Sequence, residues 1–384
     1  MKVYLDNAAT TRMHPRVFEK MMPFFKENYG NPSSIHDFGR KVRVAIEDAR
    51  ETVAGFINAD ASEIYFTSGG TEANNFPVFG ITEINRAETG KDTILLSNAE
   101  HSCVLEATAK LENKGFIKKF LPVAENGNTT IEEVGKVIDN RVSLISLIHI
   151  NNETGAVNDI SNICDSFISD DLYTHTDAVQ SFGKSRIDVK KLKVNSLSAA
   201  GHKIYGPKGI GFTYVKAGTP MEALIIGGSQ ERNRRGGTEN PAAIIGLAEA
   251  VKIADSEIEL NYNIVSALRS EMITGLKNID NEGIIINCEN EGFPYILSAT
   301  FRNDFYKNDA ESMLMYLDLN GIAVSNGAAC TSGTLKPSHV IMAMGYSAED
   351  ARGTIRFSFS PENNTEEIEY TLEVINRMAS KFRR

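Results

Sequence analysis

The most informative stretch of this chain is Ser198-Ala199-Ala200-Gly201-His202-Lys203-Ile204-Tyr205-Gly206-Pro207-Lys208-Gly209-Ile210-Gly211-Phe212. It places Lys203 among glycines, small residues and a proline, and a strand-like run over residues 209–215 overlaps its end. Glycine lets the backbone turn tightly and lets other groups come close. This setting suits an amine that must reach a fixed partner, because lysines form Schiff bases with carbonyl substrates and with pyridoxal phosphate (PLP). A glycine-rich surface loop is the alternative, so the function depends on the other motifs.

Composition and charge limit the class of protein. The chain has 384 residues, of which 42% are hydrophobic and 23% charged, and this is enough for two globular domains. A net charge of -10 without a basic cluster argues against nucleic acid as a partner. Because no apolar run could target or span a membrane, we expect a cytoplasmic protein. The cysteines are far apart, which favours a reducing compartment without a metal site: Cys103, Cys164, Cys288 and Cys330.

Apolar runs alternate with helical patterns along most of the chain. A helix is expected from Arg40, where apolar residues recur on one face. The buried-strand candidates are residues 63–67, 93–97, 142–150, 172–176 and 209–215. Such alternation predicts an α/β fold with a mostly parallel sheet covered on both faces.

The last third has a different pattern. A helix over residues 241–278 is long enough to bridge two domains, and a capped helix begins at residues 364–367. Shorter strands are expected between them, at residues 296–301, 321–325 and 354–358. We predict a large domain, residues 13–256, and a smaller α+β domain, residues 1–12 and 257–384.

Two motifs at strand ends fit a phosphorylated ring. Ser68-Gly69-Gly70-Thr71 lies between a strand and a helix, where free N–H groups, the helix dipole and the Thr71 hydroxyl favour an anion. Asp177 follows a strand, and a carboxylate there could pair with the pyridine nitrogen of PLP. A plain turn and a helix cap are the respective alternatives.

Four further residues could take part in catalysis or binding. Asn152 could donate to a phenolic oxygen or a carboxylate, and His101 could stack on a flat ring and shuttle protons. Arg356, inside a strand pattern, could grip a substrate carboxylate or form an internal salt bridge. Cys330, in a run of small residues, is expected to be accessible and reactive, unlike the other cysteines. A turn, a structural histidine and a buried thiol are the alternatives for Asn152, His101 and Cys330.

Taken together, these motifs resemble the cysteine desulfurases, which belong to the class V PLP-dependent aminotransferases. The resemblance runs nearly end to end and is carried by residues 4–11, 30–36, 67–75, 151–153, 177–180, 201–203, 235–240 and the loop around Cys330. It implies an aspartate-aminotransferase-like fold, PLP as cofactor, and conversion of L-cysteine to L-alanine with the sulfur left on the enzyme as a persulfide. The sulfur would then serve iron–sulfur cluster assembly or other sulfur-containing products. A class V aminotransferase, a selenocysteine lyase and a non-catalytic binding subunit are the alternatives.

The resemblance also implies residue roles. Lys203, His101 and Cys330 would be catalytic, with Cys330 attacking the substrate sulfur, and Asn152 and Arg356 would bind the substrate. Cofactor contacts are implied for Gly70, Thr71, Asn152, Asp177, Gln180, His202, Lys203 and Thr238. Thr238 would reach the phosphate of the neighbouring subunit, which implies a homodimer.

Two departures from the family pattern affect these expectations. Ala200 stands where the family usually has a serine that binds the phosphate, so one donor is expected to be lost. The chain ends at Arg384, whereas relatives that feed the housekeeping iron–sulfur scaffold often have a longer tail, which leaves the sulfur-acceptor protein open. The spacing of Cys330 and Arg356 matches the branch with the longer catalytic loop.

Overall fold

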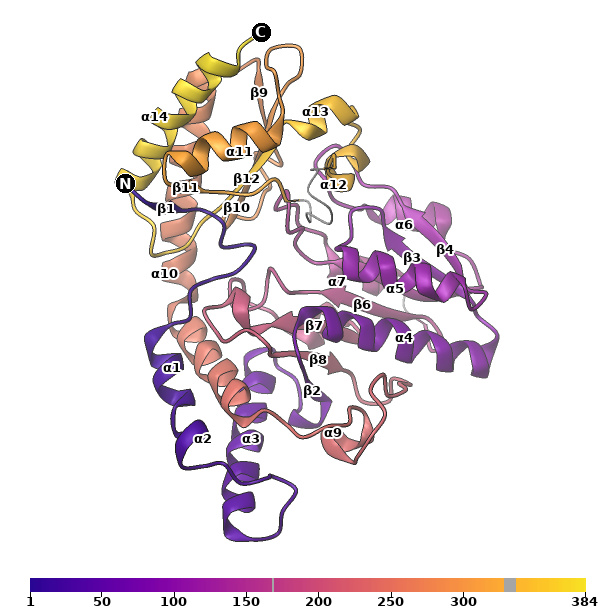
Figure 1. The fold of residues 1–384 in the computed structure, drawn as a ribbon. Helices are drawn as coiled ribbons and strands as arrows, with labels where there is room; N and C mark the ends of the chain where they lie inside the picture. The colour runs from indigo at the N-terminus through magenta and orange to yellow at the C-terminus, as the bar shows by residue number, and fades with distance from the viewer. Residues whose placement is uncertain (168, 328–335) are drawn as a thin grey trace.

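The structure is a computed structural model that describes residues 1–167, 169–327 and 336–384. Cys330 lies outside the described residues. Figure 1 shows two parts, one built on a seven-stranded sheet and the other on a three-stranded sheet, with the long helix α10 (Pro241–Asp280) running past both. Both sheets have helices packed against them, as an α/β fold requires.

The larger sheet is mostly parallel. Its strand order is β2-β8-β7-β6-β5-β3-β4, and β8 runs in the direction opposite to the other six strands. The strands are β2 (Ile64–Thr67), β3 (Thr93–Ser97), β4 (Ile117–Leu121), β5 (Val142–Ile148), β6 (Tyr173–Asp177), β7 (Ser196–Ala200) and β8 (Gly211–Val215). The predicted mostly parallel sheet is therefore confirmed.

Helices cover both faces of this sheet. Leu95 packs in one apolar cluster with α3 (Asp37–Phe56) and α10, whereas Ile94 and Leu96 pack in another with α4 (Gly70–Thr89) and α5 (Ser102–Glu112). Successive strand side chains point to opposite faces, which explains why neighbours in β3 belong to different clusters. The remaining elements of this part are α1 (Pro15–Met21), α2 (Pro23–Lys26), η1 (Ala61–Glu63), α6 (Ile131–Val137), α7 (Ile160–Phe167), α8 (Val189–Leu192), η2 (Gly201–Lys203) and α9 (Gln230–Asn233).

The smaller part is antiparallel at its centre. Its sheet has the order β12-β10-β9, and the chain start joins it, because β1 (Val3–Tyr4) pairs in parallel with β11 (Ile322–Ala323). The elements are β9 (Ile284–Asn287), β10 (Ile296–Phe301), α11 (Ala310–Leu319), α12 (His339–Ala343), α13 (Ala348–Arg352), β12 (Thr354–Ser358) and α14 (Thr365–Phe382). The start of the chain thus reaches the smaller part before entering the larger one.

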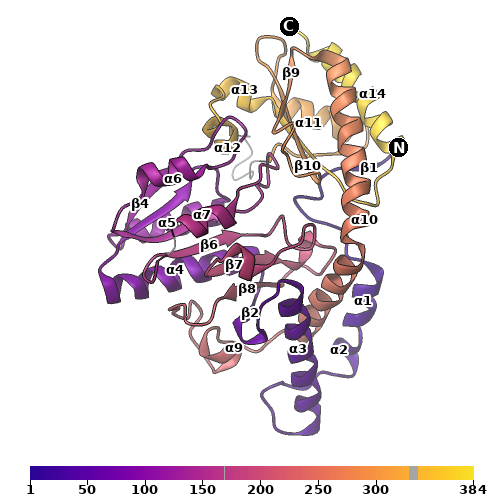
Figure 2. The same cartoon turned by 180° about the vertical axis from the view of Figure 1, so that it is seen from behind.

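Helix α10 connects the two apolar cores. It is 40 residues long, which corresponds to about 60 Å at 1.5 Å per residue. Figures 1 and 2 show from opposite sides that it runs alongside both parts. Ile253 packs in the core of the larger part and Val265 in that of the smaller part. The domain boundary near residue 256 stays a prediction that this split of the cores supports.

Most expected elements were placed correctly, but some were missed. β3, β10 and β12 match their expected ranges, and α14 begins with the expected capping box at Asn364. β4, β7 and β9 were not predicted; β7 consists largely of the small residues that precede Lys203, which lack a clear strand pattern. Within the described ranges, no helix is both long and apolar enough to cross a bilayer.

Candidate active site

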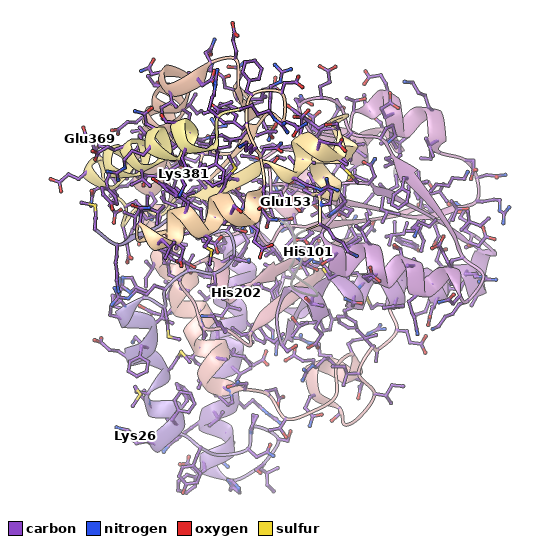
Figure 3. The ribbon with its side chains drawn as sticks, turned by 45° about the horizontal axis from the view of Figure 1, so that its top comes forward. Lys26, His101, Glu153, His202, Glu369 and Lys381 are labelled. Atoms are coloured by element: carbon purple, nitrogen blue, oxygen red, sulfur yellow. The ribbon has the colours of Figure 1, made fainter. Side chains whose placement is uncertain are left out.

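A cavity of about 400 Å³ lies where the two parts meet. The ends of β5, β6 and β7 and the start of α4 form one wall, and Ala8, Ser325 and Arg356 approach from the smaller part. It brings together the predicted residues Gly70, Thr71, His101, Asn152, Asp177, Gln180, His202, Lys203 and Arg356. In Figure 3, the labelled His101 and His202 lie toward the middle of the molecule, away from Lys26 and Glu369 at its periphery.

The chain start fixes Lys203 in this cavity. Its amine donates to the carbonyl oxygens of Ala8 and, at 2.7 Å, of Ala9. Thr11 binds both sides of the lysine, because its backbone N–H donates to the His202 carbonyl and its hydroxyl accepts from the Tyr205 N–H. Burial, with a smaller contribution from the charge of Arg356, lowers the pKa of Lys203 to about 8. An amine with such a pKa is available as a nucleophile and base near neutral pH.

Asp177 ends β6 and is held as an acceptor. One carboxylate oxygen accepts from the Val179 N–H at 2.9 Å and the other from the Asn74 amide at 2.7 Å. The Asn74 oxygen faces Nε2 of His175 at 3.0 Å, and burial lowers the pKa of His175 to about 3. The neutral ring therefore carries its proton on Nε2 and donates to Asn74, which leaves the Asn74 amide to donate to Asp177. Asp177 both closes a local turn and faces the cavity.

Asn74 is a site residue that the sequence reasoning missed. It follows Gly70 by four residues in α4, so both lie on the same helix face. A polar side chain at this spacing from the expected phosphate turn was the signal that could have identified it.

The start of α4 forms an anion cradle. Gly69 has φ 153°, a conformation that glycine tolerates best, and Gly70 follows as the first helical residue. A Cβ at Gly70 would lie 3.0 Å from Val179 and 3.5 Å from the Cβ of Ala200, so the backbone approaches the cavity wall closely. The first N–H groups of a helix have no intrahelical partner and can bind an anion. Ala200 contributes no hydroxyl to this cradle.

Arg356 forms an internal salt bridge and also lines the cavity. It is 4% exposed, pairs with Asp6 at 2.8 Å and donates to the Asn152 carbonyl at 2.8 Å. Its Nε is buried and has no hydrogen-bond partner among the described residues, although Arg356 lines the cavity. The internal salt bridge is present, and it holds the guanidinium at the cavity wall, where a carboxylate could bind.

His101 has a defined tautomer. It caps α5, and its Nδ1 accepts from the Cys103 N–H at 3.2 Å, so the proton of the neutral ring lies on Nε2. Cys103 was expected to be buried or incidental, but it is half-buried and lines the cavity, with Sγ 3.0 Å from Nδ1 of His101. Burial, reinforced by the Asp177 charge, raises the pKa of Cys103 to about 12 and keeps it a thiol. It is therefore a poor nucleophile.

Among the described residues, one predicted site residue, Thr238, does not line the cavity. Thr238 lines a separate cavity of about 220 Å³ beside Ser68, so its expected contact with a neighbouring subunit stays a prediction. Cys330 cannot be placed, but Ser325 and Gly327, shortly before it in sequence, line the active-site cavity.

The cavity residues fit PLP in chemistry and arrangement. The α4 cradle suits a phosphate, Asp177 a protonated ring nitrogen, and the Gln180 amide a phenolic oxygen. The amine of Lys203 suits the aldehyde. Burial, aided by neighbouring lysines, lowers the pKa of His202 to about 4, so this ring is neutral and can donate to a phosphate without adding charge.

Comparison with known proteins identifies the family. The sequence pattern of the family described as "Aminotransferase class-V" matches residues 3–371. Cysteine desulfurase IscS of Dictyoglomus turgidum is 41% identical over 382 residues, which cover 100% of this chain and 95% of that protein. Cysteine desulfurase IscS of Methanosarcina thermophila is 40% identical over 388 residues, which cover 99% of this chain and 93% of that protein. A solved structure of a NifS-like protein superposes with a TM-score of 0.90 at 36% identity and covers 100% of both chains. The chain therefore belongs to the class V aminotransferase family, and within it to the cysteine desulfurases.

Proposed function

We propose that this protein is a homodimeric, PLP-dependent cysteine desulfurase that converts L-cysteine to L-alanine and holds the sulfur as a persulfide on Cys330. The observation that carries the proposal is one cavity that combines the Lys203 amine, the Asp177 carboxylate and the Arg356 guanidinium. Gly327 lines the same cavity three residues before Cys330, which supports access of that thiol to the substrate. Class V enzymes depend on PLP, and the cavity residues fit it.

Each residue would have a defined task. Arg356 would bind the substrate carboxylate, and Asp177 would keep the cofactor's ring nitrogen protonated. When bound, PLP supplies an electron sink for the carbanion that forms at the substrate Cα. The Lys203 amine, once free, would take the Cα proton, which its pKa of about 8 permits near neutral pH. His101, with its proton on Nε2, lines the same cavity and would support proton transfer.

The sulfur step balances without an external oxidant. The Cys330 thiolate attacks the substrate sulfur, the Cβ–S bond breaks and a new S–S bond forms on Cys330. The electron pair of the broken bond stays with carbon, and a proton completes the methyl group of alanine. Carbon is reduced and sulfur is oxidised, so the products are alanine and the enzyme persulfide. A low thiol pKa would favour this attack.

The partners and location belong to the same proposal. Thr238 would complete the phosphate site of the partner subunit, and a thiol of an acceptor protein would receive the sulfur for iron–sulfur or other products. The cysteines among the described residues, Cys103, Cys164 and Cys288, are free thiols. Free thiols are typical of a reducing compartment, which supports a cytoplasmic location.

Replacement of Cys330 tests the sulfur step. Cys330→Ala should still bind PLP and respond spectroscopically to L-cysteine, but should release no sulfide in the presence of reductant. Brief exposure of the wild type to L-cysteine should add one sulfur to the peptide that contains Cys330, as measured by mass spectrometry. Cys164→Ala is the matched control, because Cys164 is buried outside the cavity. Near-normal sulfide release by Cys330→Ala would contradict the proposal and favour another class V activity.

Replacement of Lys203 tests the cofactor link. The wild type should be yellow, and borohydride should fix PLP to a single peptide that contains Lys203. Lys203→Ala should lose this link, because among the described residues no other lysine lines the cavity. Lys208→Ala, in the same loop but exposed, is the control. A borohydride-stable link in Lys203→Ala would reject the assignment.

A further inference from the structure

A second lysine, Lys184, is buried behind the active-site cavity. Its side chain is 4% exposed, and its amine lies 3.2 Å from Oε1 of Gln180. The amine also lies 5.5 Å from the centre of the Tyr295 ring. In the part of the chain that the structure describes, Lys184 forms no ion pair with a carboxylate. A buried charge usually has an ionic partner, so this amine requires an explanation.

The charges around Lys184 are mainly positive on the cavity side. Lys203 on η2 and Arg356 on β12 act on it, and together with burial they lower the pKa of Lys184 to about 7. His202 is neutral. On the other side, Lys184 lines a separate cavity of about 260 Å³ with Glu257 and Glu362, neither of which pairs with it. Arg356 is paired with Asp6, and Asp177 also faces the cavity, but Lys184 itself has no carboxylate partner among the described residues. An anion that enters the active-site cavity would therefore stabilise the positive charge of Lys184.

Lys184 also decides how the Gln180 amide is oriented. An ammonium can only donate hydrogen bonds, so the atom of Gln180 that faces it must be the oxygen. The Gln180 nitrogen then points the other way and donates to the Ala8 carbonyl at 2.9 Å. Its second N–H remains available, and Gln180 lines the active-site cavity. A flipped amide would place an NH₂ group against the ammonium.

We propose that Lys184 is a positioning residue for the cofactor: it fixes Gln180 with an N–H toward the phenolic oxygen of PLP and adds a positive charge behind that amide. The inference rests on the proposed PLP cofactor but not on the sulfur chemistry. Lys184 acts through Gln180 and contacts neither substrate nor cofactor. The effect of Lys184 should be strongest on the pKa of the nitrogen that links PLP to Lys203, because the proton on this nitrogen responds to the same nearby charges as the phenolic oxygen.

The test is a pH titration of the visible absorption of lysine-bound PLP in the holoenzyme. Removal of a nearby positive charge raises the pKa of the proton on the lysine-bound cofactor. Lys184→Met should therefore raise the midpoint of this titration by about one to two pH units, as expected for a unit charge about 6–12 Å away at an effective dielectric constant near 20. The dissociation constant of PLP should rise about tenfold. Lys184→Arg, which keeps a charged donor, should stay near the wild-type midpoint.

Matched variants separate this role from a structural one. Lys190→Met removes the same charge from an exposed position on α8 and should leave the midpoint unchanged. Lys184→Gln, a polar neutral replacement, should shift the midpoint in the same direction, and it carries the test if Lys184→Met does not fold. A folded, PLP-loaded Lys184 variant of neutral charge with a wild-type midpoint would overturn the inference. Sulfide release from L-cysteine by the wild type is measured separately, so failure of the proposed function would be recognised independently.

Discussion

A buried ion pair holds the segment that leads to Thr238. Removal of this ion pair should lower the stability of the protein by a measurable amount. Arg50 on α3 and Glu231 on α9 have side chains that are 4% and 3% exposed, and two hydrogen bonds of 2.7 and 2.8 Å join them. Glu231 also accepts from the Phe66 N–H at 2.9 Å. Glu231, Arg232 and Asn233 all have left-handed backbone angles, with φ of 42°, 55° and 64°. Such angles are unfavourable for residues other than glycine, so an external anchor must hold them.

Glu231→Gln should destabilise the protein strongly. It keeps the side-chain volume but leaves the buried Arg50 guanidinium with only the half-exposed Glu47 as a charge partner, and loss of a buried partner costs about 3–5 kcal/mol. For a unit of roughly 250 residues, this corresponds to a fall in Tm of about 6–10 °C. If the anchor positions Thr238 for the partner's phosphate, PLP should also dissociate faster from the variant. The assays are differential scanning calorimetry of the apoenzyme and PLP release followed by absorbance.

Two comparisons make the result decisive. Asp255→Asn breaks an exposed pair with Arg186, in which the side chains are 55% and 58% exposed, and should change stability by less than about 1 kcal/mol. The double variant Arg50→Met, Glu231→Leu removes both buried charges and should recover much of the stability that Glu231→Gln loses, because the remaining carboxylate of Glu47 is half-exposed and solvated. A Tm for Glu231→Gln within 2 °C of wild type, as for an exposed pair, would refute the reasoning.

Two further predictions concern the cofactor cradle and the buried amines. Ala200→Ser should lower the dissociation constant of PLP about three- to tenfold in an equilibrium titration, because a hydroxyl near the start of α4 adds one hydrogen bond to the phosphate. Unchanged or weaker binding would contradict this prediction. Burial lowers the pKa values of Lys184 and Lys203 to about 7 and 8 from the ordinary 10.5. Between about pH 7 and pH 10.5, the unfolded chain therefore binds more protons than the folded chain. Apoenzyme stability from these groups should therefore rise with pH above about 7. The free energy of unfolding in urea should rise less from pH 6 to pH 9 for Lys184→Met than for wild type. Equal rises for the two proteins would contradict this prediction.

The sequence by itself determined the fold class and most of the candidate site, because these features depend on local patterns. Alternating apolar runs predicted a mostly parallel sheet, and the carboxyl ends of parallel strands meet at one edge. Asp177 at a strand end and Gly70 at a helix start could therefore be expected to lie close together. The glycine-rich context made Lys203 a candidate, and the other motifs together with the family resemblance were needed to assign it. The family resemblance added Gln180 and His202, whose neighbours in sequence give no separate signal.

The tertiary structure decided which polar groups are buried together, because this depends on contacts between residues far apart in the chain. Asn74 bonds to Asp177 across 103 positions, and Glu231 bonds to Arg50 across 181. No local pattern reveals such a pairing, since the sequence around each partner would fit an exposed side chain as well as a buried one. Lys184 is the clearest example. A lysine is expected to be exposed, and only the packed structure buries this one without a carboxylate partner among the described residues and leaves its amine facing Gln180. Burial and charge are collective properties of the fold, and they set the pKa values and orientations on which the proposed chemistry depends.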